Sequence, residues 1–325
     1  MVVRQASHAG SWYTDDGEQL DQELQGWLDS VPQEVSEVEP AGDSCTLPVK
    51  GARAIIGPHA GFSYSGPNAA YGYKCIDVDN IKRVFLLGPS HHVYLEDCAL
   101  SSCTEYETPL GNLRIDQEAL SKLRGEGDWL TMNTSVDEEE HSLEMHLPYI
   151  YKIFEHRIDD IKLVPIMVGS LRYAKEQYYG ELLAPYLADR QNLFVVSSDF
   201  CHWGSRFRYK YYKAPGDSRP TNLSARTGCP AGAPIWESIQ ALDTAGMAAV
   251  ARLDHAKFKQ YLDETQNTIC GRHPIGVLLA AVNKLFPVGS EGPRLRFVKY
   301  DQSNKVRSPA DSSVSYASAY LWLPN

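Results

Sequence analysis

The feature that most constrains the fold is a set of short apolar runs, each ended by a glycine or a polar turn. The run Val84–Leu87 stops at Gly88-Pro89 and leads into His91 and His92. A run of this length without polar residues predicts a strand buried on both faces. Such strands belong to parallel sheets that are covered by helices. The strands predicted from runs of this kind lie at 52–57, 83–88, 161–168 and 193–197.

Helical patterns alternate with these strands. Along 17–29, apolar residues recur at helical spacing, and Asp15 or Asp16 can cap the helix. Two closing strands, 294–299 and 314–322, alternate in character and are predicted to be antiparallel. The sequence therefore predicts an α/β fold with a mainly parallel central sheet, helices on both faces and some antiparallel strands. Further helices are predicted through 69–74, from near Asp116, and at 172–188, 235–252, 254–264 and 275–286.

Three of the predicted strands end in a loop that carries a histidine. His59 follows 52–57, His91 follows 83–88, and His202 follows 193–197. In open α/β sheets, ligands bind just outside the carboxyl ends of the strands. Each histidine alone could be an ordinary loop residue, but all three are expected on the same edge. The edge is therefore the predicted functional site.

Cys270 adds a candidate anionic ligand. It lies just ahead of the helix predicted at 275–286, next to Arg272 and His273. A helix dipole and nearby cations lower a thiol pKa, so we expect a thiolate. Two histidines and one anion, with open positions, describe a mononuclear metal site for oxygen chemistry or metal-assisted hydrolysis.

Several other residues are candidates for the wall of the same pocket. Trp12, Tyr13 and Tyr64 offer aromatic surface, either as a pocket wall or as packing of the N-terminal segment. The stretch from Arg206 to Tyr212 is basic and aromatic, and either binds an anion or forms a solvated loop edge. Arg forks beside aromatic rings suit phosphotyrosine. The remaining residues assigned to this pocket are His92, His146, Arg206 and Arg272.

The segment His141-x-x-Glu144-x-His146 departs from the zinc-protease motif, which requires His-Glu-x-x-His. Two interpretations stay open for it. The segment either lies behind the metal ligands and supports them, or it anchors the helix that follows.

Composition limits the partners. The 325 residues carry a formal net charge of −10, which argues against nucleic acid or an anionic membrane surface as a partner. No apolar run approaches the ~18 residues that span a bilayer, and the N-terminus has no secretory signal pattern. Seven irregularly spaced cysteines argue against a disulfide framework. We expect a protein of the cytoplasm without membrane insertion, and the nucleus stays open as a second location.

The motifs together resemble the Memo family, named for mediation of ErbB2-driven cell motility. The resemblance runs nearly from end to end and indicates a single Memo-like domain over 1–325. Segments near 31–51 and 213–234 look like surface insertions. The motifs that carry the resemblance are Ser7-His8-Ala9-Gly10-Ser11-Trp12-Tyr13, Pro58-His59-Ala60-Gly61, Gly88-Pro89-Ser90-His91-His92, the stretch from Glu140 to Tyr149, the stretch from Ser197 to Gly204, and the stretch from Thr268 to Gly276.

The resemblance implies a fold related to class III extradiol dioxygenases, which hold non-haem iron with two histidines and a glutamate. It places the metal-binding histidines at His59 and His91, and Cys270 at the glutamate position. It places the acid/base histidine at His202, and we expect Asp199 to orient this histidine. A thiolate is softer than a carboxylate and can be oxidised. A cysteine in place of the glutamate therefore disfavours ordinary catechol cleavage and favours metal holding or redox chemistry.

The resemblance also implies a function: an iron- or copper-binding redox and signalling protein, linked to cell motility, the cytoskeleton and invasive growth. Such a protein is a possible metal-dependent oxidoreductase. The alternative is a catalytically silent module that binds a phosphotyrosine peptide or acts as an adaptor through the same pocket. Its partners are then phosphotyrosine-containing or cytoskeletal signalling proteins. A zinc-type amidohydrolase built on the same ligands is a third hypothesis.

Overall fold

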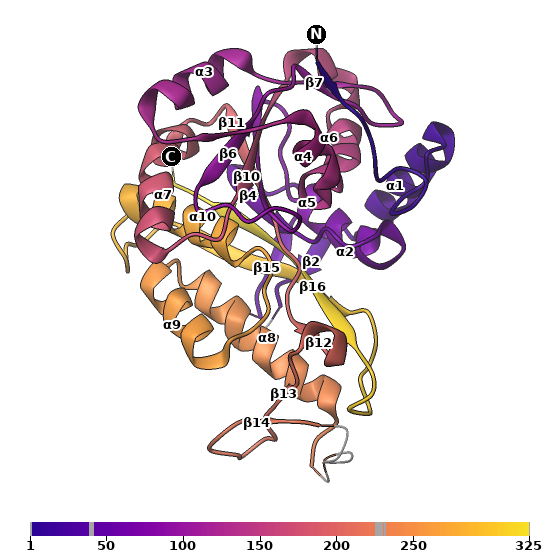
Figure 1. The fold of residues 1–325 in the computed structure, drawn as a ribbon, viewed down its shortest axis with the longest axis vertical. Coiled ribbons are helices and arrows are strands. Elements are labelled where there is room, and N and C mark those ends of the chain that lie inside the picture. The colour runs from indigo at the N-terminus through magenta and orange to yellow at the C-terminus, as the bar shows by residue number, and fades with distance from the viewer. Residues whose placement is uncertain (1, 39–41, 225–229, 231, 325) are drawn as a thin grey trace.

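The computed structural model describes residues 2–38, 42–224, 230 and 232–324. At its centre lies a nine-stranded sheet in the order β12-β16-β4-β11-β5-β10-β6-β9, with β15 paired to β16 (Figure 1). The predicted class, a mainly parallel sheet with some antiparallel strands, is confirmed. The strands of this sheet are β4 (Ala52–Gly57), β5 (Arg83–Pro89), β6 (Cys98–Ser101), β9 (Leu130–Met132), β10 (Lys162–Val168), β11 (Asn192–Ser197), β12 (His202–Trp203), β15 (Arg294–Gln302) and β16 (Ser313–Trp322).

The four strands predicted from apolar runs form the middle of the sheet. β5 runs parallel to β11 on one side and to β10 on the other, and β11 runs parallel to β4. Every residue of β5 from Val84 to Pro89 is buried, as a strand covered on both faces requires. Because these strands are parallel, their carboxyl ends meet at one edge. The closing strands β15 and β16 are antiparallel, as predicted.

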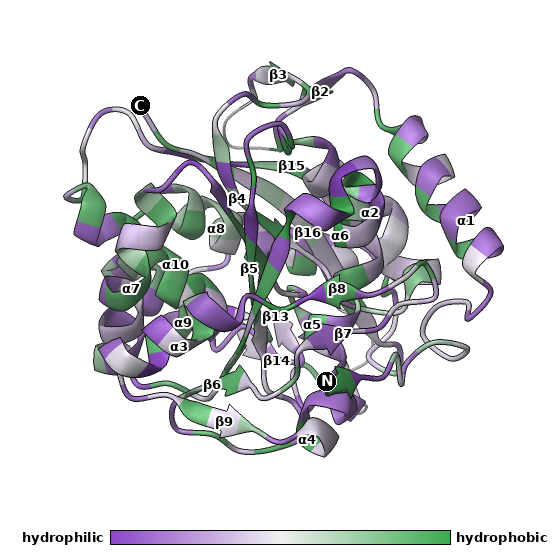
Figure 2. Cartoon of the chain, turned by 90° about the horizontal axis from the view of Figure 1, so that it is seen from above, coloured by the Kyte–Doolittle hydropathy of each residue, from purple (hydrophilic) through white to green (hydrophobic). Residues whose placement is uncertain are grey.

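Helices cover both faces of the sheet (Figure 2). The helices against one face are α1 (Gly17–Ser30), α2 (Phe62–Lys74), α5 (His141–Glu144) and α6 (Leu147–Ile153). The helices on the other side are α7 (Tyr173–Ala188), α8 (Ile235–Ala251), α9 (His255–Thr265) and α10 (Arg272–Leu285). Side-chain caps begin several of them: Asp16, one of the two residues predicted for this role, caps α1, and Asp254 caps α9.

A second, small sheet attaches the N-terminus. β1 (Val3–Arg4) pairs in parallel with β7 (Glu105–Tyr106), which pairs with β8 (Leu113–Arg114). Two helices complete this part of the chain: α3 (Gln117–Glu126), capped by Asp116, and α4 (Thr134–Glu139). The small sheet holds the first residues of the chain beside α4 and α5.

The two segments expected as insertions are more ordered than a loop interpretation suggests. In the first, β2 (Glu34–Ser36) and β3 (Ser44–Thr46) form a hairpin, and Val35 and Leu47 are buried. Residues 39–41 lie outside the described residues. In the second, β13 (Tyr211–Tyr212) pairs with β14 (Thr221–Asn222). Within 213–234, residues 225–229 and 231 also lie outside the described residues. The segment near 31–51 is ordered because it carries a few apolar side chains within a mostly polar stretch, and burying them requires an ordered backbone.

Candidate metal centre

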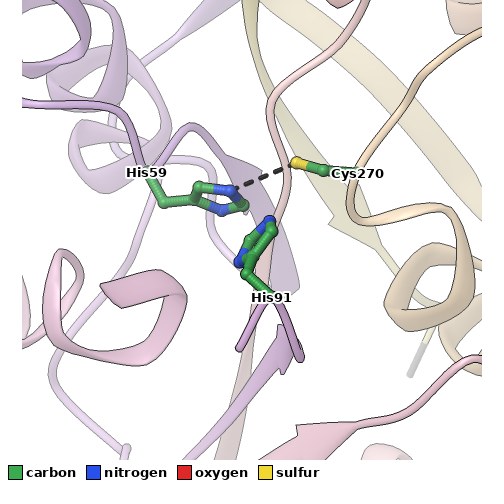
Figure 3. A group of neighbouring side chains, drawn as sticks. All are labelled: His59, His91 and Cys270. Atoms are coloured by element: carbon green, nitrogen blue, oxygen red, sulfur yellow. Dashed lines mark hydrogen bonds between the residues drawn. The ribbon is translucent and has the colours of Figure 1, made fainter. Parts of the chain in front are cut away.

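The three predicted ligands converge at the carboxyl edge of the sheet (Figure 3). His59 follows β4, His91 follows β5, and Cys270 precedes α10. One ligand atom from each lies within 4.8 Å of the others. Nε2 of His59 is 3.1 Å from Sγ of Cys270, and the rings of His59 and His91 are 5.2 Å apart. The predicted convergence is confirmed, while metal binding stays a prediction.

The buried imidazole of His59 is held in one tautomer. Its Nδ1 lies 2.6 Å from Oγ of Ser197, which donates its own proton to the carbonyl of Ser142 at 2.7 Å. Since that hydroxyl proton is already committed, Nδ1 must donate and Nε2 must carry the lone pair. Nε2 is the atom that faces Cys270. Burial lowers the pKa of His59 well below its ordinary value, so the ring is neutral and able to bind a metal.

His91 is held by a buried carboxylate. Glu140 accepts from Nδ1 of His91 at 2.9 Å, from its main-chain N–H at 2.6 Å, and from the N–H of Ser142 at 2.8 Å. Burial alone would raise the pKa of Glu140, but the hydrogen bonds that it accepts from His91 outweigh burial and lower the pKa to about 2. A carboxylate accepts only, so Nδ1 donates and Nε2 is free for a metal. Metal-binding histidines commonly have such a partner.

The expectation of a thiolate at Cys270 is wrong for the metal-free protein. Burial raises the pKa of the thiol well above its ordinary value, and the nearby carboxylate of Asp199 adds to this. The main-chain N–H of Asp199, 3.2 Å from Sγ, and the charge of Arg272 act in the opposite direction but do not prevail. Desolvation therefore outweighs the helix and cations. A metal ion at this site would displace the thiol proton on binding.

His202 lies close enough to His59 to influence its pKa. Its Nδ1 donates to the carbonyls of Phe200 at 2.8 Å and Thr268 at 3.1 Å. The neutral ring therefore has an unprotonated Nε2. Burial lowers the pKa of His202, and the charge of His91 contributes in the same direction. His202 thus has the form of a proton acceptor.

Asp199 does not orient His202 in the structure, since the two carbonyls do so. Its carboxylate accepts the main-chain N–H of His59 at 2.9 Å, and the residue is 3% exposed. Burial raises the pKa of Asp199 to about 7. Asp199 therefore fixes the loop that carries His59. A sequence position near His202 could not reveal this, because the contact spans the neighbouring strands β4 and β11.

Trp12 and Tyr13, both predicted as parts of an aromatic wall, lie in different places. Trp12 packs on the ring of His141 at 4.4 Å, and the exposed His92 approaches the same ring edge-on at 5.9 Å. Tyr13 is instead a core residue: it is 5% exposed and donates to Glu144 at 2.9 Å. Its prediction as a wall residue is wrong, because its hydroxyl finds a buried carboxylate.

The other predicted pocket residues lie at different depths. Tyr64 is 63% exposed on the first turn of α2. Arg206 is exposed and lies over the ring of Phe207, which contacts His202 edge-on. Arg272 is half-buried, close enough to influence Cys270. In the part of the chain that the structure describes, none of the three makes a hydrogen bond to His59, His91 or Cys270.

His146 is not a pocket residue, because it is 1% exposed beneath the site. Its Nδ1 lies 2.7 Å from the hydroxyl of Tyr73. Of the two interpretations of the segment 141–146, the one that places it behind the metal ligands as support holds for His141. His141 stacks on His91 at 4.4 Å and supports the site. Glu144 instead anchors the N-terminal segment, because it accepts from Tyr13 and from residues near the start of the chain.

Sequence reasoning missed Glu140, Ser142 and Ser197, which determine how the histidines point. All three lie inside motifs that carried the family resemblance. A glutamate or serine next to a histidine is common on surfaces, so nothing in the pattern distinguished them. Their role depends on the strand order, which brings 140–142 between the ends of β5 and β11.

The chain is similar in sequence to known proteins over nearly its whole length. Residues 4–320 match the family model described as Memo-like protein. The chain is 48% identical to Protein MEMO1 of Rattus norvegicus, over 99% of this chain and 98% of that protein. It is 47% identical to Protein MEMO1 of Homo sapiens, with the same coverage. Protein memo-1 homolog of Caenorhabditis elegans is 42% identical over 99% of this chain and 84% of that protein.

Among the described residues, no helix is both long and apolar enough to cross a membrane. The family model and these relatives extend over nearly the whole chain. The chain belongs to the Memo-like protein family.

Proposed function

We propose that this protein binds iron or copper through His59, His91 and Cys270 and works as a redox and signalling protein. The observation that carries the proposal is the convergence of three ligand atoms within 4.8 Å, with both imidazoles held so that Nε2 is free. Two nitrogens and a sulfur suit iron or copper better than hard cations, which prefer oxygen ligands.

A metal bound there would supply open positions for dioxygen or a substrate. His202 is the residue that moves a proton, because its Nδ1 is committed to two carbonyls and its Nε2 can accept. Asp199 acts indirectly by holding the main chain of His59. This assignment makes the protein a dioxygenase-like oxidoreductase whose sulfur ligand disfavours ordinary catechol cleavage.

The signalling part of the proposal rests on the family resemblance. It links the metal centre to cell motility, the cytoskeleton and invasive growth, with phosphotyrosine-containing or cytoskeletal signalling proteins as partners. The expected compartment is the cytoplasm, and a nuclear pool is compatible with it.

The deciding experiment measures iron and copper in protein purified aerobically and anaerobically. We expect bound metal in the wild type and a loss of it in His59→Ala and Cys270→Ala. The matched control is His92→Ala, because His92 is exposed beside the ligands. Equal and negligible metal in the wild type and the ligand variants would refute the proposal. Ester or amide turnover that zinc stimulates and iron does not would instead favour an amidohydrolase.

A second candidate is a phosphotyrosine-peptide or adaptor module without catalysis. The favouring observation is that exposed Arg206 and half-buried Arg272 flank a site with an aromatic rim. Arginine forks recognise phosphate well. Calorimetry with a phosphotyrosine peptide and its unphosphorylated form tests this. Equal affinities for the two forms would exclude the module.

A further inference from the structure

Arg4 is a buried cation at the start of the chain. Its side chain is 0% exposed, on the short strand β1. Burying a guanidinium is costly unless charged and polar partners satisfy it. Nε donates to the carboxylate of Asp137 at 3.1 Å, Nη1 to the carboxylate of Glu144 at 2.7 Å, and Nη2 to the carbonyl of Glu140 at 3.0 Å.

These partners lie on both sides of one short segment. Asp137 belongs to α4, Glu144 belongs to α5, and Glu140 connects the two helices. Asp137 is itself fixed, because it accepts from Ser101 at 2.7 Å and from Tyr106. Arg4 therefore holds the segment at both ends and, through the carbonyl of Glu140, in the middle.

The same segment holds both histidines of the candidate metal centre. The carboxylate of Glu140 accepts from Nδ1 of His91 at 2.9 Å. The carbonyl of Ser142 accepts from Ser197, which in turn accepts from Nδ1 of His59. A displacement of 140–142 would thus move the acceptor of His91 together with the carbonyl that orients the Ser197 hydroxyl beside His59.

The N-terminal segment also depends on these contacts. Glu144, which Arg4 neutralises, accepts the main-chain N–H of His8 at 2.8 Å. Trp12, four residues later, packs on His141 at 4.4 Å. The buried carboxylate of Glu144 therefore also helps to position Trp12 beside His141.

We propose that Arg4 is a positioning residue for the metal centre, acting through Glu140 and Ser142 to hold His91 and His59 with Nε2 directed at Cys270. The proposal rests on the proposed function for its consequence, which is metal affinity. Its structural content, the tautomer of the two rings, can be measured without any metal.

The test compares Arg4→Lys with Arg83→Lys. Lysine keeps the positive charge but lacks the fork that reaches three acceptors at once. Arg83 is the matched control: it pairs with buried Asp116 at 2.6 Å, at the end of β5 opposite to His91. Circular dichroism first establishes that both variants are folded.

Two readouts follow. Nitrogen-15 NMR of the metal-free protein reports the tautomers, and we expect the Nδ1–H form of His59 and His91 to lose dominance in Arg4→Lys only. Competition with a chelator reports affinity for ferrous and cuprous ions. We expect affinity to fall about 10-fold or more in Arg4→Lys, the size seen when the partners of metal ligands are altered. Arg83→Lys should keep the wild-type value within about 2-fold.

The outcomes separate the two proposals. If Arg4→Lys is less stable but keeps both tautomers, the positioning role is wrong and Arg4 is only structural. If the wild type binds no metal, the proposed function fails, while the tautomers still decide the role of Arg4. If Arg4→Lys does not fold, Glu144→Gln replaces it, because this variant weakens the hold of Arg4 without touching either histidine. Unchanged tautomers in Glu144→Gln would then overturn the proposal.

Discussion

The two sides of the candidate metal centre are held by different chemistry. On the histidine side, His59 and His91 each donate to a side chain, a serine in one case and a carboxylate in the other. On the cysteine side, which comprises Cys270 and His202, the contacts are mostly with main-chain groups. The histidine side therefore depends on particular side chains, whereas the cysteine side depends on the path of the backbone.

The buried carboxyl groups on the two sides differ in the direction of their pKa shift. On the histidine side, Glu140 has a pKa of about 2 and is charged. Beneath the cysteine side, Asp243 of α8 accepts from the N–H of Cys201 and from Asn267 and Tyr300. Burial raises its pKa to about 6. One carboxyl is stabilised as an anion by a histidine, and the other has neutral donors alone.

The largest expected effect is on the pH dependence of stability. The pKa of Glu140 is lowered from 4.5 to about 2, so its stabilising contribution is complete above pH 4.5. It is lost as the pH falls through about 2, and it amounts to about 3 kcal/mol. Urea unfolding between pH 2 and pH 8 measures the free energy of unfolding. We expect Glu140→Gln to remove this part of the acid destabilisation.

For Asp243 we expect the opposite pH dependence of the free energy of unfolding, and this residue provides the matched test. Its pKa is raised from 3.8 to about 6, so its favourable contribution is present below pH 3.8 and is lost as the pH rises through 6. The size is again about 3 kcal/mol. Asp243→Asn should flatten the unfolding free energy between pH 4 and pH 6. Equal pH profiles for the Glu140 and Asp243 variants would contradict the distinction between the two sides.

Next in size is the effect of Glu140 on metal affinity. Glu140→Gln places an amide N–H among three donors, so the hold on His91 weakens. We expect affinity for ferrous or cuprous ions to fall about 10- to 100-fold. Chelator competition measures it, with His92→Ala as the control on the exposed rim. Wild-type affinity in Glu140→Gln would mean that His91 needs no anionic partner.

Some parts of the site could be predicted from the sequence, and others required the assembled structure. His59, His91 and His202 were predictable because each follows a buried strand, and parallel strands end at one edge. Glu140 and Ser197 were not predictable, because their role is a hydrogen bond set by strand order. The ionisation of Cys270 was predicted wrongly, since a position before a helix says nothing about burial.

Most of the fold was predictable because apolar runs and helix caps are local features of the sequence. The central strands and helix α1 follow directly from them. The hairpin β2–β3 was missed, because its few apolar residues are spread through a polar stretch. Local patterns thus predict elements well, while sparse patterns and long-range contacts require the assembled structure.

A smaller effect comes from two neighbouring serines that serve opposite sides. Ser197 accepts from Nδ1 of His59, whereas Ser198 accepts the main-chain N–H of Gly271 at 3.1 Å beside Cys270. We expect Ser197→Ala to lower metal affinity about 10-fold, because His59 loses its partner. Ser198→Ala should lower it less, by about 3-fold, because the other backbone contacts of Cys270 stay in place. Chelator competition on both variants provides the comparison, and the reverse ranking would contradict it.

The smallest expected effect is that of Thr268→Val on the cysteine side. The hydroxyl of Thr268 accepts the N–H of His202 at 2.8 Å and donates to its carbonyl at 2.9 Å. Losing both bonds should lower the free energy of unfolding by about 1 kcal/mol, measured in urea. Metal affinity should stay within about 2-fold, since backbone carbonyls, which valine retains, hold Nδ1 of His202. A 10-fold loss of affinity would show that side chains hold the cysteine side as they hold the histidine side, because the backbone path alone would then be insufficient.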